Sequence, residues 1–144
     1  MARKKRLATR GSWLRLAGSH ISHTLRKQTD DRKHEANWYG NLGTVFQSLG
    51  EFDKAKECFE KALAMRTKNG DKIGEATDYG NLGAVYTSLG EYDRAKKYLE
   101  EALAIKIQTG DKDGEIAVYV NLGTVFIWLS EYGKAKEYLE KALV

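Results

Sequence analysis

The sequence predicts an all-α protein built of stacked helical hairpins. Three observations support this prediction: the chain repeats itself with a period of 40 residues, its 144 residues include no proline, and its apolar residues recur at helical spacing. Proline is the main helix breaker, so its absence permits long helices. The 14 glycines then remain as the residues that separate one helix from the next.

Three copies of the repeat align without gaps. Residues 35–74 and 75–114 are identical at 23 of 40 positions, and residues 115–144 match the second copy at 16 of 30. One helical pair cannot bury the apolar stripes of both its helices, so the copies must stack. We therefore expect a repeat domain over residues 35–144, preceded by a basic arm over residues 1–20 and a partial capping helix over residues 21–34.

The first helix of each copy is expected over Glu35–Leu49, Glu75–Leu89 and Glu115–Leu129. In the first copy the apolar residues of this segment form one helical stripe. Gly50 and Gly90 should end the first two of these helices, whereas the third copy has Ser130 at the same place. The stripe consists of Tyr39, Leu42, Val45, Phe46 and Leu49.

The second helix of each copy follows three residues later, over Asp53–Asn69 and Asp93–Thr109 in the first two copies. The aspartate that opens each segment is expected to be the N-cap, because its side chain can accept a hydrogen bond from a free backbone N–H. The third copy has Gly133 there, which predicts a weaker cap. Gly70 and Gly110 are expected to be left-handed C-caps.

Each copy also repeats one set of residue types at fixed spacing. In the first copy these residues are Tyr39, Leu42, Gly43, Phe46, Ala55, Phe59 and Ala62. With this order and spacing, residues 35–144 resemble the tetratricopeptide repeat (TPR) family. The resemblance implies a helix-turn-helix solenoid, a segment of right-handed superhelix that binds proteins and has no catalytic activity. The period of 40 and the N-L-G and G-D-K-x-G-E motifs are similar to repeats of the Pins/LGN class of polarity scaffolds.

An asparagine ladder is the strongest candidate for a binding site. Asn41, Asn81 and Asn121 recur every 40 residues, each one residue before a leucine of the stripe. Stacking would place the three amides in a row on the concave surface, where each offers a donor and an acceptor to the backbone of an extended peptide. The alternative is that each asparagine bridges a neighbouring repeat locally.

The remaining groove residues are expected to be small and neutral in the first two copies and apolar in the third. Candidate contacts are Thr44, Gln47, Thr87 and Thr124, together with Trp128, which replaces a serine and could anchor a partner. Trp128 could equally pack on a following repeat. The chaperone-binding TPR subclass holds a terminal carboxylate with a lysine beside the ladder, and Gly40, Gly80 and Val120 stand there, so that subclass is disfavoured.

Catalysis has little support in the sequence, and neither a cofactor, a metal nor a small-molecule substrate is expected. The histidines, His20, His23 and His34, all precede the first copy. His20 and His23 are three residues apart and could share a metal on a helix, but no acidic or cysteine ligand stands near this pair, which favours a solvated helix face. The single cysteine, Cys58, occupies the place of Tyr98 and Tyr138 in the other copies, which favours a packing role.

Charge is distributed unevenly along the chain. Residues 1–29 contain eight basic and no acidic residues, whereas the rest of the chain has a net charge of −4. The arm resembles a mitochondrial presequence or a weak nuclear signal, and a solvated tail is the alternative. We expect a cytoplasmic protein, with the nucleus or mitochondrion as alternatives.

The function expected from these features is that of a non-catalytic scaffold that binds an extended peptide segment of a partner in the concave groove. Two alternatives remain open. One is self-association of a longer repeat array through the C-terminal edge, where Tyr138, Leu139, Ala142 and Leu143 should be partly uncovered. The other is an adaptor that binds nucleic acid or an anionic membrane through the basic arm.

Overall fold

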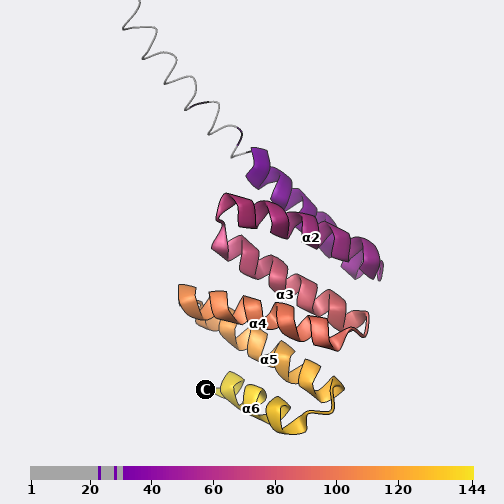
Figure 1. Ribbon diagram of the computed structural model, residues 1–144, viewed down its shortest axis with the longest axis vertical. Coiled ribbons are helices and arrows are strands. Elements are labelled where there is room, and N and C mark those ends of the chain that lie inside the picture. The colour runs from indigo at the N-terminus through magenta and orange to yellow at the C-terminus, as the bar shows by residue number, and fades with distance from the viewer. Residues whose placement is uncertain (1–22, 24–27, 29–30) are drawn as a thin grey trace, which may run out of the picture.

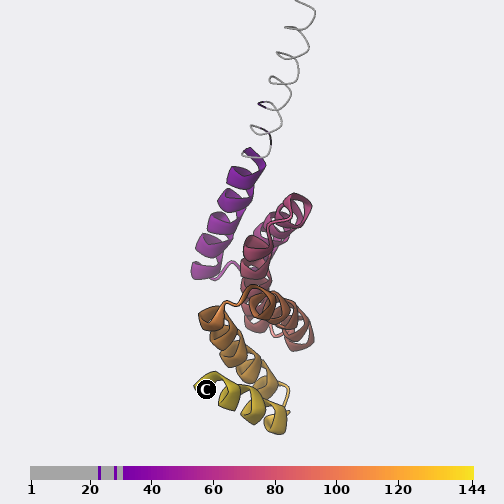
Figure 2. The same cartoon turned by 90° about the vertical axis from the view of Figure 1, so that its left-hand side faces the viewer.

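The computed structural model describes residues 23, 28 and 31–144 and shows a column of helical hairpins. The first helix of the column covers residues 31–48. It is followed by α2 (Phe52–Asn69), α3 (Lys72–Ser88), α4 (Tyr92–Thr109), α5 (Lys112–Trp128) and α6 (Tyr132–Leu143). Each helix packs on the next along the column (Figure 1), and the successive hairpins are turned relative to one another (Figure 2). These residues include no strand, so the predicted architecture is confirmed.

Every turn between helices uses a residue with positive φ. Gly50, Gly70, Gly90 and Gly110 have φ between 70° and 77°, and Ser130 has φ 60°. The predicted turns and the left-handed caps at Gly70 and Gly110 are therefore confirmed. A residue with a Cβ disfavours this conformation by roughly 1–2 kcal/mol, so Ser130 is the turn residue with the greatest backbone strain among them.

The predicted N-caps Asp53 and Asp93 are wrong. The second helices begin one residue earlier, after Glu51 and Glu91, and neither glutamate side chain caps the helix. Asp53 and Asp93 lie instead in the first turn, where a negative charge favours the positive end of the helix dipole. The expectation that Gly133 is a weaker N-cap in the third copy is wrong for the same reason. The N-cap residue of α6 is Glu131, and Gly133 lies inside the helix.

Side-chain caps are found on the first helices of the second and third repeats. Asp71 accepts a hydrogen bond of 3.0 Å from the backbone N–H of Gly74, and Asp111 accepts one of 2.9 Å from Gly114. These caps start α3 and α5 three residues before the predicted Glu75 and Glu115. The first helix also begins earlier than expected, because residues 31–34 are helical.

The core depends on close approach of the two helices in each hairpin. A Cβ on Gly43 would lie 2.8 Å from the Phe59 ring, and a Cβ on Gly83 would lie 2.6 Å from Leu99 Cγ. Only glycine allows this spacing, and the large side chains opposite fill the space that it leaves. The largest fully buried side chains are Phe59, Phe126, Leu82, Leu99, Leu122, Val85, Val125 and Asp78.

Burial varies along the column even where the residue type repeats. Val85 and Val125 are 0% and 1% exposed, whereas Val45 at the same place in the first repeat is 53% exposed. At the other end, Leu139 is half-buried although its counterpart Leu99 is 1% exposed. The stack therefore buries residues through their neighbours, and both end repeats of the described column are less covered than the middle one.

Two expectations concern parts of the chain that the structure does not describe. The arm over residues 1–20 lies wholly outside the described residues, as does most of the segment 21–30 that was expected to belong to a capping helix.

Within the described part of the chain, no helix is both long enough and apolar enough to span a membrane.

Candidate functional site

The asparagine ladder lies on the three first helices of the hairpins, outside the core. Asn41 and Asn121 are exposed and Asn81 is half-buried, while the leucines that follow Asn81 and Asn121 are fully buried. Among the described residues, no hydrogen bond joins any of these three amides to another group, although the nearby Asn37 accepts one from Arg66. The donors and acceptors of the ladder are therefore available to a ligand.

Two ladder residues share one polar hollow of about 250 Å³ at the junction of the first and second repeats. Residues of the helix over residues 31–48 and of α3 line it together with one residue of α2. Asn121 is not part of this hollow. The lining residues are Asn37, Gly40, Asn41, Thr44, Arg66, Thr77, Asp78 and Asn81.

The predicted threonine contacts already use their protons. Thr44, Thr87 and Thr124 each donate a hydrogen bond to the backbone carbonyl four residues earlier, at 3.0, 2.7 and 3.0 Å. Their hydroxyl oxygens can still accept a hydrogen bond, so each of them can receive a donor but has no proton left to give. The fourth polar candidate, Gln47, is half-buried and lies three residues after Thr44 in the sequence.

The third repeat presents apolar side chains at the equivalent places. Trp128 is 60% exposed and stacks on Tyr92 with 5.7 Å between ring centroids and an interplanar angle of 2°. Val120 and Ile127, which replace Gly80 and Thr87, are 44% and 45% exposed. The indole is thus held by a neighbouring ring while much of its surface stays accessible, as a binding anchor requires.

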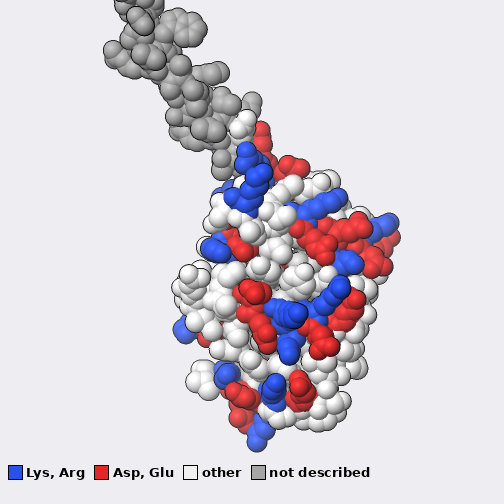
Figure 3. Space-filling view, viewed as in Figure 1, with Lys and Arg blue, Asp and Glu red and all other residues white. Residues whose placement is uncertain are grey.

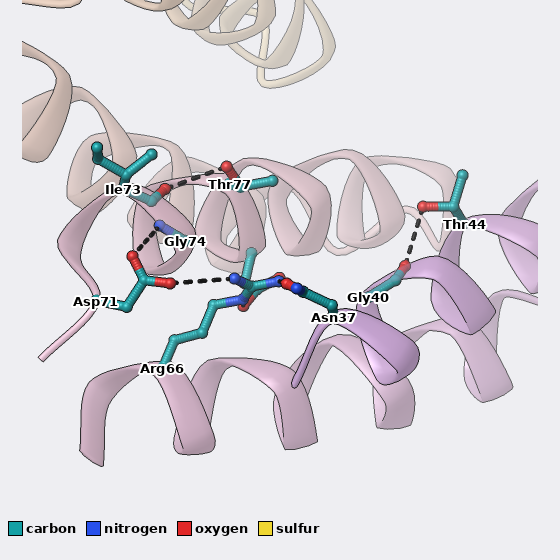
Figure 4. Close-up of polar contacts among 9 residues, drawn as sticks. Asn37, Gly40, Thr44, Arg66, Asp71, Ile73, Gly74 and Thr77 are labelled. Atoms are coloured by element: carbon teal, nitrogen blue, oxygen red, sulfur yellow. Dashed lines mark hydrogen bonds and ion pairs between the residues drawn. The ribbon is translucent and has the colours of Figure 1, made fainter. Parts of the chain in front are cut away.

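A charged cluster that the sequence analysis missed lies in the wall of the hollow. Arg66 of α2 extends toward α3, where its Nε lies 2.7 Å from Asp78 Oδ2 and its Nη1 lies 3.3 Å from Asp71 Oδ2. Its Nη2 donates a hydrogen bond of 3.0 Å to Asn37 (Figure 4). The guanidinium therefore links the first helix, α2 and α3.

Asp78 is the buried acid of this cluster, with 1% of its surface exposed. Burial raises the pKa of Asp78 to about 6, although the neighbouring Arg66 charge lowers it. One signal in the sequence could have indicated this residue: Asp78 breaks the repeat pattern, since tryptophan and valine stand at the same place in the other copies, Trp38 and Val118.

The other reactive residue types give no sign of chemistry. Cys58 is 7% exposed, and burial raises the pKa of its thiol, which disfavours the nucleophilic thiolate. His23 and His34 are exposed, and His20 lies outside the described residues. In the part of the chain that the structure describes, no three His, Cys, Asp or Glu side chains gather where they could hold a metal ion.

Comparison with protein families matches the tetratricopeptide repeat over residues 16–68, 34–108 and 74–143, which together cover most of the chain. The chain belongs to the tetratricopeptide repeat family. The TPR match confirms the family resemblance, and the Pins/LGN class stays a prediction. The first match begins at residue 16, before the first full TPR copy.

Several solved structures resemble the chain over most of its length. The TPR domain of Arabidopsis FLU is 24% identical, with a TM-score of 0.75 over 78% of this chain and 94% of that one. BtubC from P. vanneervenii is 25% identical, with a TM-score of 0.72 over 85% of this chain and 52% of that one. The second TPR domain of Spaghetti, bound to an HSP90 peptide, is 20% identical, with a TM-score of 0.66, over 81% and 96%. No curated protein sequence matches the chain.

Proposed function

We propose that the chain is a non-catalytic scaffold that binds an extended segment of a partner protein along the surface formed by the helix over residues 31–48, α3 and α5. The observation that supports this most directly is the ladder: three amides that have no hydrogen bond to another described residue, two of them at one hollow. An amide can pair with the backbone of an extended peptide whatever the peptide's sequence. Peptide binding by the related fold of Spaghetti adds support.

The character of this surface changes along the column, and that restricts the partner. The first two repeats offer small polar groups around Asn41 and Asn81, whereas the third offers Val120, Ile127 and Trp128. A segment that follows the ladder would therefore be polar at one end and have bulky apolar side chains at the other.

Charges of both signs are interspersed on the face shown in Figure 3. That face therefore has no field of a single sign that would attract nucleic acid.

The test uses peptides selected from a random display library on the wild-type chain and measured by fluorescence anisotropy. Changing Asn41, Asn81 and Asn121 together to alanine should weaken binding about a hundredfold, since each lost hydrogen bond is worth about 1 kcal/mol and at least one is lost at each asparagine. A matched control changes Glu57, Lys97 and Glu137 to alanine, which are exposed and also recur every 40 residues. Circular dichroism should show equal helicity in both variants, and equal loss of binding in both would contradict the proposal.

A second candidate function is self-association through α6. Leu139 and Ala142 are half-buried, although their counterparts Leu99 and Ala102 are 1% and 0% exposed. Uncovered apolar surface of this kind favours contact with another copy. Sedimentation velocity over a range of concentrations should show reversible association that Leu139→Lys abolishes. A wild-type chain that sediments as a monomer at every concentration would exclude this candidate.

A further inference from the structure

We propose that the hollow at the junction of the first two repeats receives a basic side chain of the bound segment, with Asp78 Oδ1 as its acceptor. This inference rests on the proposed function, because it specifies one residue of the segment that the groove binds. The chemical class is a primary ammonium or a guanidinium, the two cationic side chains that donate several hydrogen bonds.

The first argument is that one oxygen of a buried carboxylate has no hydrogen-bond donor among the described residues. Asp78 is 1% exposed, and its Oδ2 lies against Arg66 Nε at 2.7 Å. Neither oxygen of this carboxylate has a hydrogen bond within the described residues, and the ion pair with Arg66 is closest at Oδ2, which leaves Oδ1 without a hydrogen-bond donor. Buried polar atoms are nearly always hydrogen-bonded, so an orphaned carboxylate oxygen beside a hollow indicates a donor from outside the chain.

The second argument is the charge of the cluster. Arg66 contributes one positive charge, whereas Asp71 and Asp78 contribute two negative charges, so ionisation leaves the cluster at −1. The nitrogens of Arg66 already face Asp78, Asp71 and Asn37, which leaves the guanidinium no free side for an anion. The adjacent Lys72 lies 3.4 Å from Glu75, and so it does not neutralise Asp78. A cation entering the hollow would balance the charge at short range.

The third argument is that the hollow has room and further acceptors. A Cβ on Gly40 would lie 4.0 Å from Asp78 Oδ1 and 3.5 Å from Arg66 Nη2, so the glycine keeps the approach to the carboxylate open. Asn41, Asn81 and Thr44 line the same space, and each of their side chains has an oxygen that can accept a hydrogen bond. An ammonium has three donors to satisfy, and this hollow supplies acceptors beyond the carboxylate.

The next junction lacks this arrangement, which makes the site specific to one place in the groove. Val118 stands where Asp78 does, and Lys106 stands where Arg66 does. Lys106 pairs with Asp111 at 2.9 Å, so no buried carboxylate is left without a partner there. The basic residue of the bound segment is therefore expected at the junction of the first two repeats. The apolar residues of the segment are expected at the other end of the groove, on the third repeat.

The test titrates the ¹⁵N-labelled full chain with Nα-acetyl-lysine methylamide and, separately, with the norleucine analogue, which lacks the ammonium. The lysine probe should shift the backbone amide of Gly40 and the side-chain amides of Asn41 and Asn81 in a saturable way. We expect it to bind about tenfold more tightly than the norleucine probe, a ratio typical of one charge-assisted hydrogen bond.

Two pairs of variants locate the response. Asp78→Asn should abolish the preference for lysine, whereas Asp93→Asn, which removes an exposed carboxylate on α4, should leave it unchanged. Gly40→Val fills the hollow and keeps every charge, so it should also abolish the response even where Asp78→Asn disturbs folding. Gly80→Val is its control, because a Cβ there meets nothing within 4 Å.

Three results would overturn the inference: no shift at the hollow, equal affinity for the two probes, or a preference that survives Asp78→Asn and Gly40→Val. The outcome is separable from that of the proposed function. Library peptides that need the ladder but show no basic preference would contradict the inference alone. A lysine probe that binds at Asp78, in a chain whose peptide binding ignores the ladder, would contradict the proposed function alone.

Discussion

Arg66 of α2 and Asp78 of α3 form an ion pair inside the junction of the first two repeats, with 2.7 Å between Nε and Oδ2. Arg66 is also close to Asp71, the residue that caps α3. One guanidinium therefore joins the start of α3 to its second turn and to the preceding helix. The rigidity of this junction depends on a charged contact as well as on apolar packing.

Removing Arg66 should destabilise the chain strongly. Arg66→Ala leaves the Asp78 carboxylate buried without its partner, which we expect to cost about 3–5 kcal/mol in free energy of unfolding. The double variant Arg66→Lys, Asp78→Val reproduces the residues of the next junction, Lys106 and Val118, and should cost much less. Urea unfolding at neutral pH measures both, and a double variant as unstable as Arg66→Ala would contradict this account.

The stability of the chain should fall relative to Asp78→Asn as the pH rises from about 4 to about 6. The pKa of Asp78 is raised from 3.8 to about 6 in the folded state, chiefly by burial. Over this window the folded state therefore holds a proton that the unfolded state has released, and stability decreases with pH. Residue 78 has no charge at any pH in Asp78→Asn. The difference in free energy of unfolding between the two chains should therefore change by up to about 3 kcal/mol over this window and level off above about pH 6.

Urea midpoints at several pH values for both chains provide the measurement. Arg66 and Asp71, the charged groups that face Asp78, are common to both chains. Their contributions therefore cancel in the difference. A difference that stays constant with pH would show that Asp78 is not the titrating group.

The repeat made the helices, their turns and the close approach at Gly43 predictable, because each follows from residues near one another in sequence. The Arg66–Asp78 pair was not predictable in this way. It joins two helices through a residue that only the second copy contains, and the pairing exists only once the hairpins have stacked. The stacking of Trp128 on Tyr92 depends on the same tertiary arrangement.

The caps show a different limit of the sequence. Asp53 stands near the start of α2 and Asp71 near the start of α3, and the local pattern could not show whether either side chain caps its helix. In the structure only Asp71 does so, since its carboxylate accepts a hydrogen bond from the N–H of Gly74. Since Gly74 has no side chain to collide with Arg66, the tertiary contact and the cap are compatible only with glycine there.

Which of the two variants, asparagine or alanine, is the more stable should therefore differ between Asp71 and Asp53. At Asp71, asparagine keeps a capping oxygen and alanine loses it, so Asp71→Ala should be less stable than Asp71→Asn by about 1 kcal/mol. At Asp53, which caps nothing, alanine should be the more stable variant because it has the higher helix propensity. Thermal unfolding of the four variants measures the two signs, and equal signs would contradict the assignment of the caps.

Two glycines of α3 should respond oppositely to alanine. A Cβ on Gly83 would meet Leu99 at 2.6 Å, so Gly83→Ala should cost about 1–3 kcal/mol through forced repacking. A Cβ on Gly80 meets nothing within 4 Å, so Gly80→Ala should stabilise the helix by about 0.5–1 kcal/mol. Urea unfolding distinguishes them, and two losses of similar size would mean that helix spacing is not what Gly83 provides.

The three equivalent valines should differ in their contribution to stability according to their place in the column. Val85 is 0% exposed and Val125 is 1% exposed, so truncating either to alanine should cost about 1.5–3 kcal/mol. Val45 is 53% exposed, and its truncation should cost less than about 0.5 kcal/mol. The residue and the substitution are the same at all three places. The three losses in free energy of unfolding therefore differ only through how far neighbouring helices bury each valine. A cost at Val45 equal to that at Val85 would mean that another part of the chain, or another molecule, covers the first repeat in solution.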